Sequence, residues 1–163
     1  MNASPLLDYA WISRQIPHQG TMVLLQQVLD WGVDSIRCLA DSHRAPDNPL
    51  RAHGRLGIAC GIEYAAQCMA LHAALLAPGG AAPRAGYLAS ARALQASVSR
   101  LDDIDAPLII EARRLHADAL LALYSFSLSA DGRCLLSGRA SVVLDAEGVA
   151  PSAVDGNPLK PHC

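Results

Sequence analysis

The feature that most constrains this chain is an apolar run from residue 56 to residue 77, which is followed by segments with a period of two. The run is rich in alanine, leucine, methionine and glutamine, which favour a helix, and it ends at a Pro-Gly-Gly turn. It is apolar on every side, which predicts a helix that is buried all round. Its polar residues Glu63, Gln67 and His72 are costly in hydrocarbon, so we expect a core helix and no membrane span.

Alternating side chains predict strands on both sides of this helix. After it, the pattern predicts a four-stranded meander over residues 88–98, 108–117, 120–129 and 133–144. Asp131-Gly132 is typical of a hairpin turn between the last two strands. Before the helix, two strands are expected at residues 21–31 and 35–40, and residues 41–55 form a long loop with two prolines and three arginines.

The N-terminal segment predicts a short helix over residues 5–15, with Ser4 as N-cap and Pro5 at the first helical position. Pro17 ends it. The whole layout is that of an α+β hotdog domain, in which an antiparallel sheet wraps around one long central helix. Such sheets usually join edge to edge as dimers, which removes an exposed edge. We expect one domain over residues 1–144 and a disordered, Pro/Gly/Ala-rich tail over residues 145–163.

Composition excludes several functional classes. The chain has 163 residues, a net charge of −2 and 52% hydrophobic residues, which argues for one folded domain and against nucleic acid as a partner. Five scattered cysteines without C-x-x-C spacing indicate neither a disulfide framework nor a zinc site. The N-terminus has no basic segment followed by an apolar run, so no signal peptide is expected. These features favour a cytoplasmic protein with reduced thiols.

Glu63 is the strongest candidate for chemistry. It lies in the apolar helix, and Gln67 follows four residues later on the same face. Burial favours the protonated form of a carboxyl group, which makes Glu63 a candidate proton donor and Gln67 a candidate substrate contact. The structural alternative is a buried, hydrogen-bonded glutamate near the start of the helix.

Two glycines at the start of that helix are candidate substrate-binding positions. Backbone N–H groups at Gly57 and Gly61 could hold a carbonyl oxygen, because the first turn of a helix leaves such groups without partners. The structural alternative is that these small residues let the helix pack closely against the sheet.

The histidines leave several assignments open. His53 and His43 lie in the loop before Glu63, and each is a candidate general base or a solvated side chain. His18 follows the N-terminal helix, where it either caps the helix or binds substrate. His72, within the apolar run, is expected to be a hydrogen-bonded core residue. No phosphate-binding loop, nucleophile elbow or metal cluster is present in the sequence.

Several stretches resemble the β-hydroxyacyl-(acyl-carrier-protein) dehydratases of type II fatty-acid and polyketide synthesis. Residues 16–18 (IPH) with 22–29 (MVLLQQVL) are similar to the opening motif of that family, and 61–67 (GIEYAAQ) to its central-helix motif. Residues 42–51 (SHRAPDNPLR), together with 61–67, resemble the dehydratase-like hotdog proteins of aryl-polyene gene clusters. The resemblance covers about residues 14–144.

The resemblance implies a hydro-lyase that needs neither cofactor nor metal. Its substrate would be a 3-hydroxyacyl thioester on acyl carrier protein, with Glu63 as the acid and His53 as the base, each from a different protomer. The carrier protein is acidic, and surface arginines such as Arg84, Arg113 and Arg139 are candidates for steering it.

One departure from the family pattern leaves two further hypotheses. The H-F-P segment that carries the family's base is missing, and His53 lies only ten residues before Glu63. The chain is therefore either a dehydratase, a non-catalytic or half-catalytic subunit of a heterodimer with a second hotdog protein, or an acyl-thioesterase on the same fold. We predict that the chain alone is a poor dehydratase.

Overall fold

The structure of the chain, a computed structural model, describes residues 7–77, 79 and 86–144. The main elements, in chain order, are α1 (Tyr9–Gln15), β1 (Gln27–Trp31), β2 (Ser35–Ala40), α2 (Gly61–Leu76), β3 (Gly86–Ala96), β4 (Leu108–Ala117), β5 (Leu121–Ala130) and β6 (Arg133–Leu144). Three 3₁₀ turns lie at Gly20–Met22, Ser42–Arg44 and Ile58–Cys60. The expected tail at 145–163, and also Ser4, Pro5 and Arg84, fall outside the described residues.

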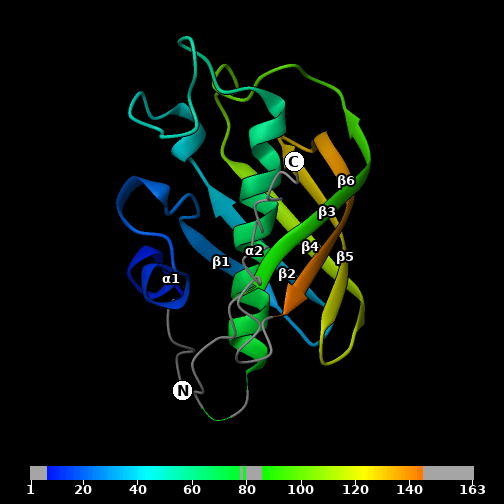
Figure 1. The fold of residues 1–163 in the computed structure, drawn as a ribbon. Helices are drawn as coiled ribbons and strands as arrows, with labels where there is room; N and C mark the ends of the chain where they lie inside the picture. Colours follow the sequence, from blue (N-terminus) through cyan, green and yellow to red (C-terminus); the bar gives the residue numbers. More distant parts are fainter. Residues whose placement is uncertain (1–6, 78, 80–85, 145–163) are drawn as a thin grey trace, which may run out of the picture.

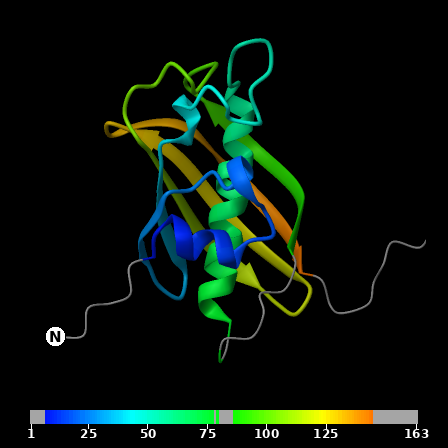
Figure 2. The ribbon, with the colours of Figure 1, turned by 90° about the vertical axis from the view of Figure 1, so that its left-hand side faces the viewer.

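The strands form an antiparallel sheet in the order β1-β2-β4-β5-β6-β3. The sheet curls around α2, and the short helix α1 packs beside α2 (Figure 1; Figure 2). Along β5, the residues that face α2 are buried, including Tyr124, Phe126 and Leu128. The core therefore fills the space between α2 and the inner face of the sheet, and the predicted α+β hotdog architecture is confirmed.

The order of the last four strands differs from the predicted meander. β4, β5 and β6 follow one another in the sheet, but β3 pairs with β6 and not with β4. The predicted limits of β2, β4 and β6 are correct, whereas β5 starts one residue later and β3 two residues earlier than expected. Strand order was missed because alternation identifies a strand but carries no information on its neighbour.

The segment before β1 is not a strand, contrary to the prediction for residues 21–26. The Gln67 side chain accepts a hydrogen bond from the Leu24 N–H at 3.0 Å and donates to the Met22 carbonyl at 2.7 Å. A buried side chain on α2 thus takes the place of a neighbouring strand for these backbone groups. The apolar side chains of this segment, including Leu25, enter the core without strand pairing.

The N-terminal helix is shorter than predicted. α1 starts at Tyr9, and the carboxylate of Asp8, not Ser4, is the N-cap, since it accepts the Trp11 N–H at 3.0 Å. Asp8 also forms a bridge to Gln27, which ties the start of α1 to β1. A helix that began at Pro5 could not make this bridge.

The central helix is buried on one side only in this chain, not all round as predicted. Tyr64, Cys68 and Leu71 are buried against the sheet, whereas Ala66 and Ala70 are half-buried on the other side. By length and composition, the helical segment Ile58–Leu76 could cross a membrane, and 44% of its most apolar window is buried within the protein. Its half-buried side forms the wall of the site described below.

The loop at residues 41–55 packs onto the start of α2. The Ser42 hydroxyl lies 2.8 Å from the Tyr64 hydroxyl, and the Asn48 amide donates to the same oxygen at 3.1 Å. Burial raises the pKa of Tyr64. Two polar residues of the SHRAPDNPLR stretch therefore hold this loop on the central helix.

Candidate functional site

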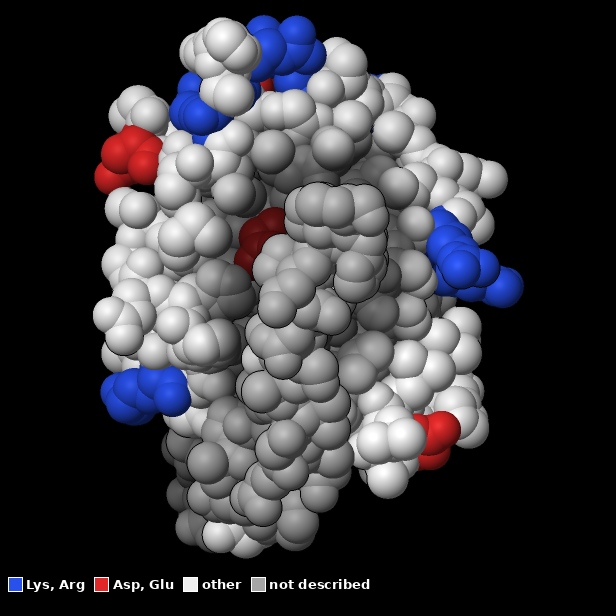
Figure 3. All heavy atoms as spheres, viewed as in Figure 1, with Lys and Arg blue, Asp and Glu red and all other residues white. Residues whose placement is uncertain are grey.

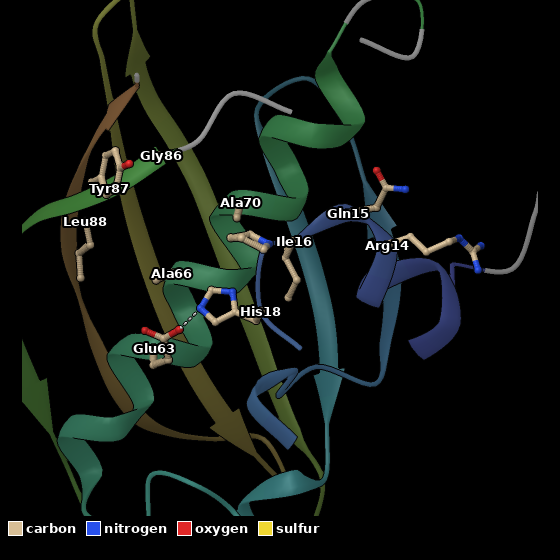
Figure 4. Close-up of a pocket in the computed structure, with 11 residues that line it drawn as sticks. Arg14, Gln15, Ile16, His18, Glu63, Ala66, Ala70, Gly86, Tyr87 and Leu88 are labelled. Atoms are coloured by element: carbon tan, nitrogen blue, oxygen red, sulfur yellow. Dashed lines mark ion pairs between the residues drawn. The ribbon is translucent and has the colours of Figure 1, made fainter. Parts of the chain in front are cut away.

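A cavity of about 660 Å³ lies on the half-buried side of α2. Its walls are residues 14–18 of the α1 end, the α2 residues Glu63, Ala66 and Ala70, and the first residues of β3, Gly86–Leu88 (Figure 4). The volume is in the range typical of small-molecule sites. Figure 3 shows an acidic side chain in a hollow on the face of the molecule that Figure 1 presents, and Glu63 is the acidic residue among those that line the cavity.

Glu63 and His18 form the polar centre of the cavity. The Nε2 atom of His18 lies 2.9 Å from Oε1 of Glu63, and the two side chains are 29% and 32% exposed. They point toward each other in Figure 4, whereas Arg14 and Gln15 lie on the far side of Ile16. His18 therefore does not cap α1; its ring reaches across to the first turn of α2.

The Nδ1 atom of His18 is buried and has no hydrogen-bond partner among the described residues. A carboxylate only accepts, so Nε2 carries the hydrogen that points to Glu63. His18 is thus placed to donate from Nε2 to Glu63, and its Nδ1 atom is an unused polar atom within the described part of the chain.

Gln67, one turn further along α2, also hydrogen-bonds the Glu63 carboxyl group. Its Nε2 donates to Oε1 of Glu63 at 3.3 Å and to the Met22 carbonyl, while its Oε1 accepts from Leu24. The side chain is fully buried, and both hydrogens of its amide nitrogen are used within the chain. Gln67 is therefore placed to position Glu63 and the segment after His18.

These contacts distinguish the two oxygens of the Glu63 carboxyl group. Oε1 receives hydrogen bonds from both His18 and Gln67. A proton carried by Glu63 consequently belongs on Oε2, because a hydrogen on Oε1 would oppose two donors. In Figure 4 the oxygen that is not paired with His18 lies on the side of Leu88 and β3. The site can therefore hold a transferable proton on the β3 side of the cavity.

The structure does not bring the two loop histidines to Glu63 within the chain. His53 is exposed in a tight turn, with a positive φ of 53°, and does not line the cavity. His43 is buried, its Nε2 lies 2.9 Å from the Ile104 carbonyl, and burial lowers its pKa. His43 thus anchors its loop, and neither histidine is placed as a base by this chain alone.

The two glycines also lie outside the cavity lining. A Cβ atom at Gly61 would come within 2.8 Å of Leu136 and 3.0 Å of Leu128, so glycine lets the start of α2 approach β5 and β6. Gly57 precedes the 3₁₀ turn and forms a bridge to Arg100. This geometry gives Gly61 the packing role that the sequence left as an alternative.

His72 is a bonded core residue, as predicted. Its Nε2 lies 2.8 Å from the Gly32 carbonyl and its Nδ1 lies 3.0 Å from the Tyr124 hydroxyl. Burial lowers the pKa of His72 and raises the pKa of Tyr124 to about 12. Both ring nitrogens are used, so His72 has no free atom for chemistry.

Sequence reasoning missed the pairing of His18 with Glu63. A usable signal existed on the helix, because Glu63, Ala66 and Ala70 follow one face at helical spacing and include the small residues that leave room for a cavity. No such signal linked His18 to this face. Among the described residues, no group of three or more histidine, cysteine, aspartate or glutamate side chains is placed to hold a metal ion.

Similar structures show how widely this fold is used. The dehydratase heterocomplex ApeI:P from Xenorhabdus doucetiae is 23% identical, covers 83% of this chain and 91% of that chain, and has a TM-score of 0.71. Thioesterase superfamily member 2 of zebra fish is 15% identical, with 85% and 99% of the two chains covered and a TM-score of 0.57. A hypothetical thioesterase with coenzyme A from Streptococcus pneumoniae is 11% identical, with 73% and 84% covered and a TM-score of 0.54. These likenesses show the hotdog fold.

The comparison with protein families identifies the family of the chain, whereas the structural likeness shows only its fold. No curated protein is significantly similar to the chain in sequence. The family described as ApeP-like, ApeP dehydratase, matches residues 10–150. That match spans most of the chain, from α1 to beyond the end of β6. The protein therefore belongs to the ApeP-like family of ApeP dehydratases.

Proposed function

We propose that this chain is the Glu63-bearing subunit of a dehydratase that removes water from 3-hydroxyacyl thioesters on acyl carrier protein. The observation that carries the proposal is the Glu63–His18–Gln67 arrangement beside the cavity. It leaves Oε2 of Glu63 as the oxygen that carries a transferable proton. Membership of a dehydratase family supports the dehydration reaction. The resemblance to the aryl-polyene proteins supports an acyl-carrier-protein thioester as the substrate.

In the proposed reaction, a base removes a proton from the carbon next to the thioester carbonyl. The electron pair of that C–H bond forms the new double bond, and the C–O bond of the 3-hydroxyl group breaks. Glu63 donates its Oε2 proton to the departing hydroxyl, which leaves as water. Each well-placed proton transfer of this kind contributes about 10²–10⁴-fold to the rate.

The base is proposed to come from a second hotdog subunit. Glu63 and His18 are engaged with each other, and His53 is exposed away from the cavity. β3 is an edge strand of eleven residues whose side chains are mostly exposed, including Tyr87 at 62%. Its first residues are also a wall of the cavity, so a partner strand added there would lie next to Glu63. The heterocomplex of the similar ApeI:P structure supports this arrangement.

The proposal is tested by an assay with 3-hydroxyacyl- and enoyl-carrier-protein, run with the chain alone and with a second hotdog subunit from the same organism. We expect weak interconversion by the chain alone and a sharp rise when the partner is added. Release of free carrier-protein thiol is measured in parallel, because a thioesterase would produce it and a dehydratase would not.

Three outcomes would contradict the proposal. Thiol release without double-bond formation would make the protein a thioesterase. Full activity of the chain alone that is abolished by His53→Ala would make His53 the base. Unchanged activity of a Glu63→Gln subunit in the active complex would remove Glu63 from the reaction.

A further inference from the structure

The outer face of the sheet carries a row of positively charged side chains. Strand register places Arg92 opposite Arg139, Arg139 opposite Ser125, and Ser125 opposite Arg113. These side chains point away from α2, because the next residue on β5, Phe126, faces the core. Arg92, Arg139 and Arg113, which we name the arginine row, thus follow one line across β3, β6 and β4.

No described residue forms an ion pair with the row. None of its three arginines is in a salt bridge with a described residue, whereas Arg37, on the same face, pairs with Asp30 at 2.9 Å. The acidic residue nearest along the strand, Glu111, is two positions before Arg113. Like charges directly opposite each other in a sheet are unfavourable. Repulsion between Arg92 and Arg139 is therefore unfavourable in the isolated chain, and a bound acidic group would reduce this repulsion.

An apolar surface lies next to the arginine row. It is formed by outward-facing residues of β4, β5, β6 and β3, which we name the apolar strip: Leu115, Leu121, Leu123, Val143 and Tyr87. Leu115 is 51% exposed and Val143 is 41% exposed. A hollow of about 450 Å³ between row and strip is lined by Arg92, Arg139, Ser90, Ser141 and leucines of the strip. Exposed apolar surface with a charged rim is typical of interaction sites.

We propose that the arginine row and the apolar strip bind an acidic amphipathic helix of the carrier protein that brings the acyl thioester. This inference rests on the proposed function for the identity of the partner. Neighbouring strands are about 4.8 Å apart, so the row spans about 14 Å from Arg92 to Arg113. An α-helix covers that length in about ten residues. Carboxylates three or four residues apart match Arg92 and Arg139 on neighbouring strands, and carboxylates about six or seven residues apart match Arg139 and Arg113, which are two strand spacings apart. The neighbouring apolar stripe of the same helix would then enter the hollow.

The test measures binding separately from catalysis. The full-length chain is titrated into apo acyl carrier protein that is labelled with a fluorophore, and fluorescence anisotropy gives the dissociation constant. Reversing two charges with Arg113→Glu and Arg139→Glu should weaken binding about tenfold or more, because each exposed ion pair contributes modestly and reversal adds repulsion. Both positions lie away from the β3 edge, so strand pairing with a partner subunit is left intact.

Arg55→Glu is the matched control, since Arg55 is an exposed loop arginine outside the row. It should leave the dissociation constant within about twofold of the parent, because exposed charges away from a contact are largely screened. Rising salt should weaken binding of the parent and have less effect on the double variant. Near-ultraviolet circular dichroism verifies that the double variant is folded.

Equal binding by the double variant and the parent would overturn the proposal, as would equal losses of binding for the double variant and Arg55→Glu. Charge-dependent self-association of the chain through this face would also overturn it. So would charge-dependent binding of anionic lipid vesicles with no carrier-protein binding.

Turnover of a small pantetheine thioester by the two-subunit complex separates this inference from the proposed function. The double variant should retain that turnover. Absence of turnover by the parent complex would contradict the proposed function, while carrier binding would still be decided by the titration.

Discussion

His72, which lies on α2, and His18, which contacts α2 from the segment after α1, have opposite surroundings. His72 is fully buried, and its two ring nitrogens are bonded to the Gly32 carbonyl and the Tyr124 hydroxyl. His18 is 29% exposed beside the cavity, with one nitrogen on Glu63 and the other without a partner among the described residues. The first histidine joins α2 to the sheet, whereas the second leaves capacity for chemistry. An unused nitrogen is not enough to mark a site histidine, because the buried His43 also has an Nδ1 atom without a partner among the described residues. What sets His18 apart is that its ring lies at the cavity and contacts a carboxyl group there.

The largest effect is expected at the cavity. Glu63→Gln should lower the rate of dehydration by about 10²–10⁴-fold in the active complex, because the amide cannot donate the proton that leaves with the hydroxyl. Glutamine keeps the shape of the side chain and can still accept from His18, so the melting temperature should change little. Rates with 3-hydroxyacyl-carrier-protein and a thermal melt check both statements. An equal rate for variant and parent would contradict the role of Glu63.

The next effect is a loss of stability at the other histidine. His72→Ala should reduce the free energy of unfolding by about 2–4 kcal/mol, because it opens a cavity and leaves the buried Tyr124 hydroxyl without its partner. Urea denaturation measures the change. The control is His116→Ala on the exposed end of β4, which should cost less than about 0.5 kcal/mol. Similar costs for the two variants would mean that the bonds of His72 contribute little.

Removing the His18 side chain should affect activity more than stability. His18→Ala should slow dehydration by about 10–100-fold, because the His18 N–H stabilises the carboxylate that forms as Glu63 gives up its proton, and a hydrogen bond to a charged group is worth about 1.5–3 kcal/mol. The unfolding free energy should fall by less than about 1 kcal/mol, because the pair is partly exposed. His18→Gln can still donate to Glu63 and should recover part of the rate. If it were no better than alanine, the N–H donor would not be what matters.

The pH dependence of the unfolding free energy tests the effect of burial on the histidines. Burial lowers the pKa of His72 and of His43 in the folded protein, whereas both titrate near 6.5 when unfolded. The unfolded chain therefore binds more protons below that pH, and stability should fall as the pH decreases through this range. Each group contributes at most about 1.4 kcal/mol per pH unit.

Urea unfolding at pH 7.5 and at pH 5.5 measures this loss. His72→Gln should show a smaller difference between the two pH values than the parent, because one of the two groups is gone. A difference of the same size in variant and parent would assign the pH dependence to other groups.

The smallest effect is expected at His53. His53→Ala should change neither activity nor the unfolding free energy by a measurable amount, because the side chain is exposed and outside the cavity. Steady-state rates of the two-subunit complex and urea denaturation check this. A large loss of activity would mean that His53 reaches a reaction site in the assembled two-subunit complex.

The errors of the sequence-based predictions share one cause. Residues 21–26 have a strand-like composition, but Gln67 on α2 bonds two of their backbone groups, the Leu24 N–H and the Met22 carbonyl. Pro5 suits a helix start, but the cap is Asp8, whose backbone is paired with Gln27 of β1. His53 precedes Glu63 closely in sequence, yet His18, forty-five residues before Glu63, makes the contact. In each case the partner is a group that is distant in sequence or lies in a different element.

Local patterns in the sequence were enough to predict most element types and to single out Glu63 as the carboxyl group of the central helix. Helical and strand periodicity are local properties of neighbouring residues, which is why α2, β2, β4 and β6 were predictable. A single carboxyl group in an apolar helix is also visible without a structure. Three features became visible only in the folded chain: the position of β3 beside β6, the contact between His18 and Glu63, and the line formed by Arg92, Arg139 and Arg113. These depend on how the sheet closes around α2, and such packing between distant segments leaves no local pattern in the chain.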